Sequence, residues 1–174
     1  MVSELDANLL RNLLLFMNED EHRSIEDRLK EDPVCYRYYL EKMQEVRHEK
    51  DNAAVQQYDG VGKDFFGVLC SYIDRSGLKD SMVYGKIGMH RNQWYKIRKR
   101  EKRAGKAFVL KLCIVLRLDL YEANYLMLLA GYFFIPGNQT DYIVCDCLKE
   151  KIYDEAEIDE RLAHAGEQTL FSDK

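Results

Sequence analysis

Residues 79–106 read KDSMVYGKIGMHRNQWYKIRKREKRAGK, and the organisation expected for the rest of the chain follows from this stretch. Val83 and Ile87 are four residues apart, which puts both apolar side chains on one face of a short helix. Gly88 can adopt a left-handed backbone conformation at little cost, so the chain can turn sharply there, with Met89 filling the corner. The stretch predicts two helices joined by a tight turn.

The second of these helices is expected to have two unlike faces. At about 100° per residue, Trp94 and Ile97 project toward the first helix. The opposite face receives cationic, amide and phenol side chains, namely Arg91, Asn92, Tyr95, Lys96, Lys99 and Arg103. This pattern is typical of the recognition helix of a helix-turn-helix, which lies in the major groove of DNA.

Two sets of DNA-contacting residues are predicted. The N-terminal half of a recognition helix reads base edges, to which Asn and Arg can make paired hydrogen bonds. The base-side candidates are His90, Arg91, Asn92, Tyr95 and Lys96. Lys and Arg also neutralise phosphates. The phosphate-side candidates are Lys86, Arg98, Lys99, Arg100, Lys102, Arg103 and Lys106.

A run of charge is more often a solvated helix face, and such helical corners occur in proteins that never touch nucleic acid. Here, however, residues 86–111 contain ten basic residues and a single acid, Glu101, in a chain of formal net charge -4. A solvated helix normally mixes its signs. Residues 1–60 hold 8 basic and 14 acidic side chains, 61–139 hold 14 and 6, and 140–174 hold 4 and 10. A basic middle between acidic flanks favours a surface that faces phosphate.

The composition is that of a folded protein, with 47% hydrophobic and 32% charged residues in 174, and the two prolines favour helices. No apolar run approaches the length of a membrane span, and MVSELDANLL lacks the basic region of a signal peptide. We therefore expect a cytoplasmic protein with no membrane segment.

Catalytic and metal-binding patterns are missing from the sequence. The four histidines are scattered, with none at ligand spacing from a cysteine or carboxylate, and the five cysteines show no nucleophile signature. The cysteines are expected to be reduced and partly buried. We expect no catalytic residues, no metal, no cofactor and no enzymatic activity. His90 fits helix capping or DNA contact better than catalysis.

Four segments are expected along the chain. Residues 1–52 read as three helices that form an interaction or dimerisation module, 53–62 as a linker containing Gly60, 63–135 as the helix-turn-helix domain, and 136–174 as a two-helix extension. Helix-capping residues expected from 63 onward are Asp80 or Ser81, Asp119 with Glu122, Thr140, and Asp154 with Glu157.

The N-terminal module shows one resemblance. Residues 13–40, LLLFMNEDEHRSIEDRLKEDPVCYRYYL, are similar in layout to the short helical module of anti-sigma factors, which carries a Cys-Pro-x-Cys pair. Asp32 stands at the first cysteine position and only Cys35 remains, so the zinc site that the resemblance implies is not expected here. A plain dimerisation or docking hairpin is the alternative.

The remainder resembles a second family. Residues 64–135 look like the lambda-repressor-like (XRE-type) helix-turn-helix fold of bacterial and phage regulators, and residues 65–172 resemble mostly uncharacterised bacterial proteins with a helical extension. The residues that carry this resemblance are Phe66, Ile73, Asp74, Gly77, Val83, Tyr84, Arg91, Ile97, Leu116, Leu118, Leu120, Ala130, Gly131, Tyr132, Asp141, Ile152, Tyr153 and Asp154. The family usually has a polar loop with proline and serine where this chain has the basic run 98–106.

The sequence thus predicts an all-α bacterial protein: a five-helix domain with an N-terminal three-helix appendage and a two-helix extension. Its expected partner is double-stranded DNA, and its expected role is transcriptional regulation. A homodimer is expected, because one recognition helix makes few contacts. The alternative is a helical adaptor that binds a protein partner, with residues 1–52 as the expected surface. RNA binding through the same basic face is a third possibility.

Overall fold

The computed structural model describes residues 65–135 and 137–172 and eleven positions nearer the N-terminus, namely His22, Arg23, Glu26, Asp27, Lys30, Pro33, Tyr36, Arg37, Tyr39, Leu40 and Glu41. The predicted linker 53–62 and most of the predicted N-terminal module 1–52 lie outside the described residues. Every regular element of the described residues is a helix, so the prediction of an all-α chain is confirmed for them.

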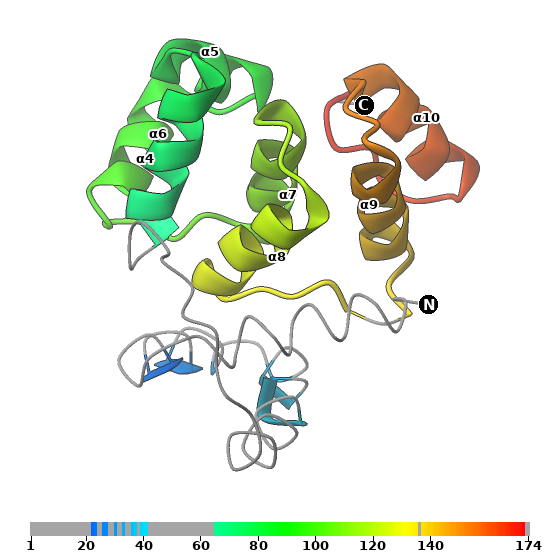
Figure 1. The fold of residues 1–174 in the computed structure, drawn as a ribbon, viewed down its shortest axis with the longest axis horizontal. Helices are drawn as coiled ribbons and strands as arrows, with labels where there is room; N and C mark the ends of the chain where they lie inside the picture. The colour runs from blue at the N-terminus through cyan, green and yellow to red at the C-terminus, as the bar shows by residue number, and fades with distance from the viewer. Residues whose placement is uncertain are drawn as a thin grey trace, which may run out of the picture.

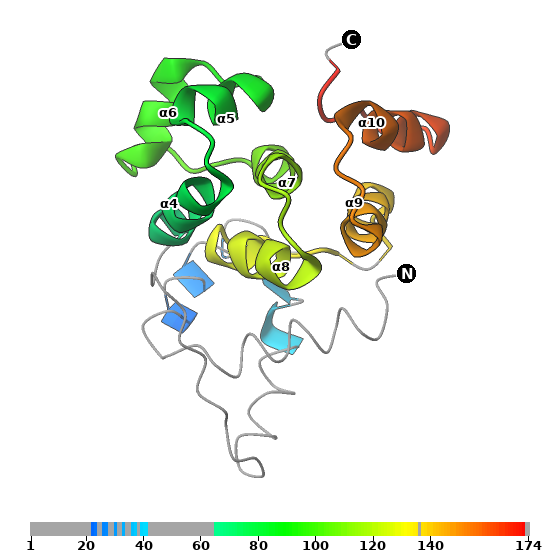
Figure 2. The same ribbon diagram turned by 45° about the horizontal axis from the view of Figure 1, so that its top comes forward.

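The helices follow one another through short connections. Their bounds are α4 Phe65–Ser76, α5 Asp80–Lys86, α6 Arg91–Arg98, α7 Lys106–Val115, α8 Leu120–Leu129, α9 Gln139–Glu150 and α10 Glu155–His164. Helix α7 lies between the α4–α6 group and the α9–α10 pair, and α8 runs beneath them (Figures 1 and 2). Contacts join α8 to α4, α7 and α9, and join α5 to both α6 and α7.

The central position of α7 follows from its composition. Its residues KAFVLKLCIV are apolar at nearly every position, and Val109, Leu110, Leu112, Cys113 and Ile114 are buried. A helix with apolar side chains all round is stable only when other elements cover it on several sides. The composition of α7 thus accounts for its central position.

The corner between α5 and α6 forms as its glycine predicts. Gly88 has a φ of 68°, and the N–H of Met89 donates to the carbonyl of Tyr84 at 2.9 Å, which closes the end of α5. Met89 is buried. The apolar side chains predicted to pack inside the corner are also buried, namely Val83, Ile87, Trp94 and Ile97.

Helix starts were predicted with mixed success. Asp119 and Glu122 form the expected capping box of α8, and Asp154 accepts the N–H of Glu157 at the start of α10. Thr140 does not cap α9: Asn138 accepts the N–H of Asp141, and the Thr140 hydroxyl donates to Glu167 instead. Thr140 lies one position inside the helix, and its hydroxyl binds a tertiary partner, Glu167, instead of the helix N-terminus.

The predictions for two further helix starts were also wrong. Neither Asp80 nor Ser81 caps α5, since Lys79 occupies the N-cap position and makes no side-chain cap bond. The Asp80 carboxylate instead accepts from Trp94 and Arg98 on α6. His90 is the N-cap residue of α6, but its side chain makes no cap bond either.

Helix α6 ends earlier than expected. It stops at Arg98, and Arg100 adopts a left-handed conformation with a φ of 60°, so the helical face predicted to extend to Arg103 is wrong. Like charges three and four residues apart destabilise a helix, which disfavours its continuation through this cationic run. The basic side chains beyond Arg98 therefore lie on a turn and a loop.

One contact between the described part of the N-terminal region and the main body is an aromatic pair. The Tyr39 side chain is buried, and the centroid of its ring is 6.0 Å from that of Phe133, which follows α8. Leu40 beside it is exposed. Among the described residues, none of the helices has the length and apolar character needed to cross a membrane.

Candidate nucleic-acid interface

The inner side of α6 is fastened to two neighbouring helices. The Trp94 indole donates to the Asp80 carboxylate on α5 at 3.2 Å, and Arg98 donates to the same carboxylate oxygen. The Arg98 guanidinium also lies 5.6 Å from the centroid of the Phe66 ring on α4. These contacts fix the orientation of α6, because they act at both its middle and its last turn.

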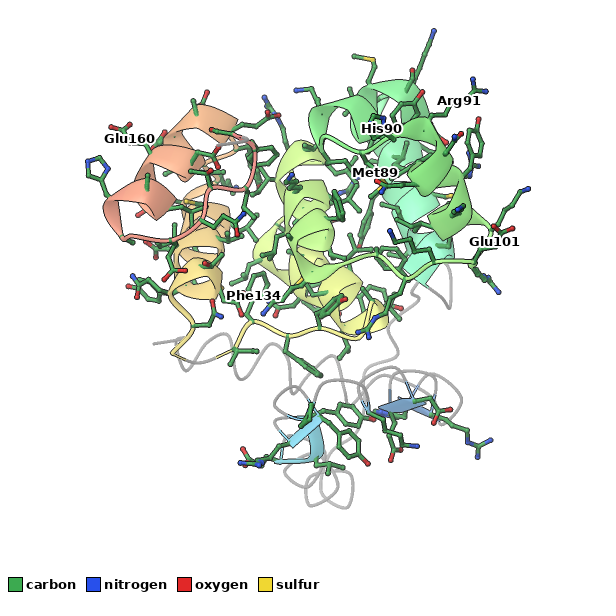
Figure 3. All side chains as sticks on the ribbon, turned by 180° about the vertical axis from the view of Figure 1, so that it is seen from behind. Met89, His90, Arg91, Glu101, Phe134 and Glu160 are labelled. Carbon is green, nitrogen blue, oxygen red and sulfur yellow. The ribbon has the colours of Figure 1, made fainter. Side chains whose placement is uncertain are left out.

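The outer side of α6 carries the predicted base-side residues. All five are exposed: His90 is the N-cap residue of α6, and Arg91, Asn92, Tyr95 and Lys96 lie on the helix itself. The Arg91 guanidinium lies 5.4 Å from the centroid of the Tyr95 ring, which restricts the directions in which this cation can point. Figure 3 shows His90 and Arg91 at one end of this surface and Glu101 beyond the other end.

A cationic turn continues the surface beyond α6. Lys99, Arg100 and Lys102 are exposed, and the N–H of Glu101 donates to the carbonyl of Lys96 at 2.8 Å, which folds the turn back onto the helix. Glu160 of the acidic helix α10 lies on the opposite side of the molecule in Figure 3. The basic and acidic surfaces are therefore separated in space as well as in sequence. We call the exposed cations Arg91, Lys96, Lys99, Arg100 and Lys102 the basic face.

Other cations from the predicted phosphate-side set have partners inside the protein. Arg103 donates to the carbonyls of Ala130 and Gly131, both at 3.2 Å, and its guanidinium lies 4.5 Å from the centroid of the Tyr132 ring. These carbonyls are left without helical donors at the end of α8, so Arg103 completes that helix end. Lys86 forms an ion pair of 3.5 Å with Glu155 of α10.

Lys106 has the most buried partner. Its ammonium donates to Asp141 at 2.5 Å, and Asp141 is 1% exposed. Burial raises the pKa of Asp141 above its usual value, although the Lys106 ammonium and the Ile135 N–H act in the opposite direction. The pair joins the start of α7 to the start of α9, so the contact serves the fold.

Two acidic anchors were not predicted as such. Asp80 holds α6, and Asp141 holds Lys106 and the N–H of Ile135. The sequence indicates Asp141 only as a residue that carries a family resemblance, and Asp80 only as a possible helix cap. The signal that could have identified Asp80 is a carboxylate 14 residues before the only tryptophan, whose indole N–H needs an acceptor when buried.

The thiols of the described region are reduced. Cys113, Cys145 and Cys147 are buried and Cys70 is half-buried, and none of the four forms a disulfide. Burial raises the pKa of the Cys113 thiol, which keeps it protonated and unreactive. Within 65–135, 137–172 and the eleven earlier positions, His, Cys, Asp and Glu side chains do not gather into a group of three that could hold a metal ion.

No family model, curated protein or solved structure matches this chain. The two resemblances drawn from the sequence therefore remain predictions.

Proposed function

We propose that this chain is a cytoplasmic DNA-binding protein that regulates transcription, with α4–α8 as a lambda-repressor-like helix-turn-helix domain. In this proposal α6 enters the major groove, and His90, Arg91, Asn92, Tyr95 and Lys96 face the base edges. The support is the order of five helices with a glycine corner between the second and third, and the central place of α7.

The observation that carries the proposal is the division of α6 into two sides. Trp94 and Ile97 are buried, while the residues around them on the other side are exposed and include two cations and an amide. A helix held rigidly by its apolar side presents the other side in a fixed orientation, which base readout requires.

The proposed phosphate contacts are fewer than the sequence alone indicates. Lys99, Arg100 and Lys102 extend the basic face and are the proposed phosphate-side residues. Arg98, Arg103 and Lys106 are assigned to the fold, because each has a carboxylate or carbonyl partner within the chain. Lys86 forms an ion pair with Glu155 and is not counted in the basic face.

A homodimer is part of the proposal. A single α6 offers five side chains to the bases, and two-fold repetition doubles both the site length and the specificity. Either residues 1–52 or the acidic C-terminal segment is the proposed interface, because neither contributes a cation to the basic face.

The deciding experiment is a titration of the full chain into random-sequence duplex DNA at several salt concentrations. Three neutralised phosphates, one for each proposed phosphate-side residue, predict a slope of about -3 in log affinity against log salt. The Lys96→Glu/Lys99→Glu variant should bind far more weakly. The Arg117→Glu/Lys151→Glu variant makes the same change in net charge at exposed cations outside the basic face, and should bind as the parent does.

The alternative is a helical adaptor that uses this fold to dock a protein. One observation favours it: at least four of the seven predicted phosphate-side cations have acceptors within the chain. Absence of duplex binding at low salt, with a stoichiometric protein partner retained by residues 1–52, would support the adaptor.

A further inference from the structure

A cavity with a volume of about 180 Å³ lies where the start of α4, the end of α6 and the end of α8 meet. The residues that line it are Phe65, Phe66, Ile97, Arg100, Lys102, Arg103, Ala104 and Ala130. Phe65, Ile97, Ala104 and Ala130 are buried and apolar, whereas Arg100 and Lys102 are exposed. The cavity thus has an apolar interior and a cationic opening.

The size and the walls of the cavity restrict what it can hold. An apolar protein cavity of about 150 Å³ binds benzene, so this volume accommodates one six-membered ring. Two phenylalanine rings in the wall, Phe65 and Phe66, favour an aromatic ligand, since ring pairs gain energy beyond the area they bury.

The opening of the cavity selects for charge. Arg100, Lys102 and Arg103 contribute three positive charges, and no acidic residue is among the described residues that line the cavity. Arg103 is held in place by its bonds to the carbonyls of Ala130 and Gly131, so its charge is fixed beside the cavity. An anionic group on the ring would be stabilised there.

From this combination we propose that the cavity binds a small monocyclic aromatic carboxylate, with its ring between Phe65, Phe66 and Ile97 and its carboxylate toward Lys102 and Arg100. This site shares Arg100 and Lys102 with the basic face, but the aromatic ring would lie in the cavity behind them, and ligand binding there does not depend on DNA binding.

The test is an NMR titration of the isotopically labelled full chain with benzoate, and with benzyl alcohol and hexanoate as comparators. Benzoate should cause saturable shifts at Phe65, Phe66, Ile97 and Ala130. Benzyl alcohol keeps the ring without the charge and should bind about fivefold more weakly, because exposed charges contribute modestly. Hexanoate keeps the charge without the ring and should also bind more weakly.

Variants separate the site from general charge effects. Lys102→Gln should weaken benzoate binding by about two- to fivefold. Lys99→Gln removes another exposed cation, one that does not line the cavity, and should leave the benzoate affinity unchanged. Ala130→Leu should fill the cavity and abolish the shifts caused by benzoate. If this variant does not fold, the comparison of Lys102→Gln with Lys99→Gln provides the test.

The proposal is overturned if benzoate gives no saturable shifts at the lining residues. Equal affinities for benzoate and benzyl alcohol would overturn the anionic assignment. Tighter binding of hexanoate than benzoate would overturn the aromatic one.

Discussion

The indole Nε1 of Trp94 donates a hydrogen bond of 3.2 Å to Oδ2 of Asp80, and this bond joins the buried side of α6 to the first turn of α5. Trp94 is 2% exposed, and its indole N–H is satisfied by the Asp80 carboxylate, which is 38% exposed. The bond therefore fixes the helix that carries the proposed base contacts.

Asp80→Ala should lower the free energy of unfolding by about 1–3 kcal/mol, because it leaves the buried indole N–H without an acceptor. Asp80→Asn keeps an acceptor oxygen and should cost less. Urea unfolding followed by the fluorescence of Trp94, the only tryptophan, measures both. Asp74→Ala removes an exposed carboxylate from α4 and serves as the control; an equal loss there would show that the bond contributes nothing specific.

Gly88→Ala should destabilise the protein by about 1–2 kcal/mol, since a φ of 68° brings a Cβ too close to the backbone. An added Cβ would meet nothing closer than the Lys111 ammonium at 4.0 Å, so the cost comes from the backbone and not from crowding.

Gly85→Ala is the matched control for this substitution. Gly85 is inside α5, exposed, with nothing within 4 Å of an added Cβ, so alanine should stabilise by about 0.5–1 kcal/mol. Thermal unfolding of both variants gives the comparison. If both variants changed the unfolding temperature in the same direction, the role of Gly88 in the turn would be contradicted.

Arg103→Ala should reduce stability by about 1.5–3 kcal/mol, because the guanidinium makes charge-assisted hydrogen bonds to two carbonyls at the end of α8. Lys99→Ala removes a fully accessible cation from the same run and should change stability by less than about 0.5 kcal/mol. Chemical denaturation of the two variants side by side measures the difference. If Arg103→Ala were as stable as the parent, Arg103 would again be a candidate for phosphate contact.

Stability should fall in acid through Asp159. Burial alone would raise the pKa of Asp159, but the hydrogen bonds that its carboxylate accepts from Ser172, Phe171 and Leu170 hold that pKa below its usual value. The stabilisation is therefore complete above the unfolded pKa, about 3.9, and is lost as the pH falls through the lower folded value.

Asp159→Asn is the variant that tests this. It should be less stable than the parent by about 1–3 kcal/mol at neutral pH, and the difference should shrink on acidification to about pH 3. Urea unfolding across this range gives both curves. If the difference in stability between parent and variant did not change with pH, Asp159 would be excluded as the source of the acid sensitivity.

On DNA selected from a random pool, Arg91→Ala or Asn92→Ala should lose about 1–3 kcal/mol of discrimination at the base pair contacted. Lys99→Ala should instead weaken selected and random duplexes alike and reduce the salt slope by about 1. Fluorescence anisotropy with both duplexes measures the two effects, and Lys151→Ala controls for net charge. Equal effects of all variants on both duplexes would refute this division of roles.

Local features of the fold were predictable from sequence. The α5–α6 corner, the inward side of Trp94 and Ile97 and the capping box of α8 were all expected, and the structure has them. Each depends on residues within a few positions of one another, through helical periodicity, a glycine with positive φ, or a cap. The exposure of the base-side residues follows from the same periodicity.

The roles of the cations depended on tertiary structure. Arg103 and Lys106 have the same residue types and sequence surroundings as Lys99 and Lys102, yet their partners lie 27 to 35 positions away. Sequence by itself determined the all-α class, the helical corner and a concentration of positive charge. Only tertiary structure decided which charges remain at the surface, because the acceptors that bind Arg103 and Lys106 come into reach only when α8 and α9 pack beside the loop and α7.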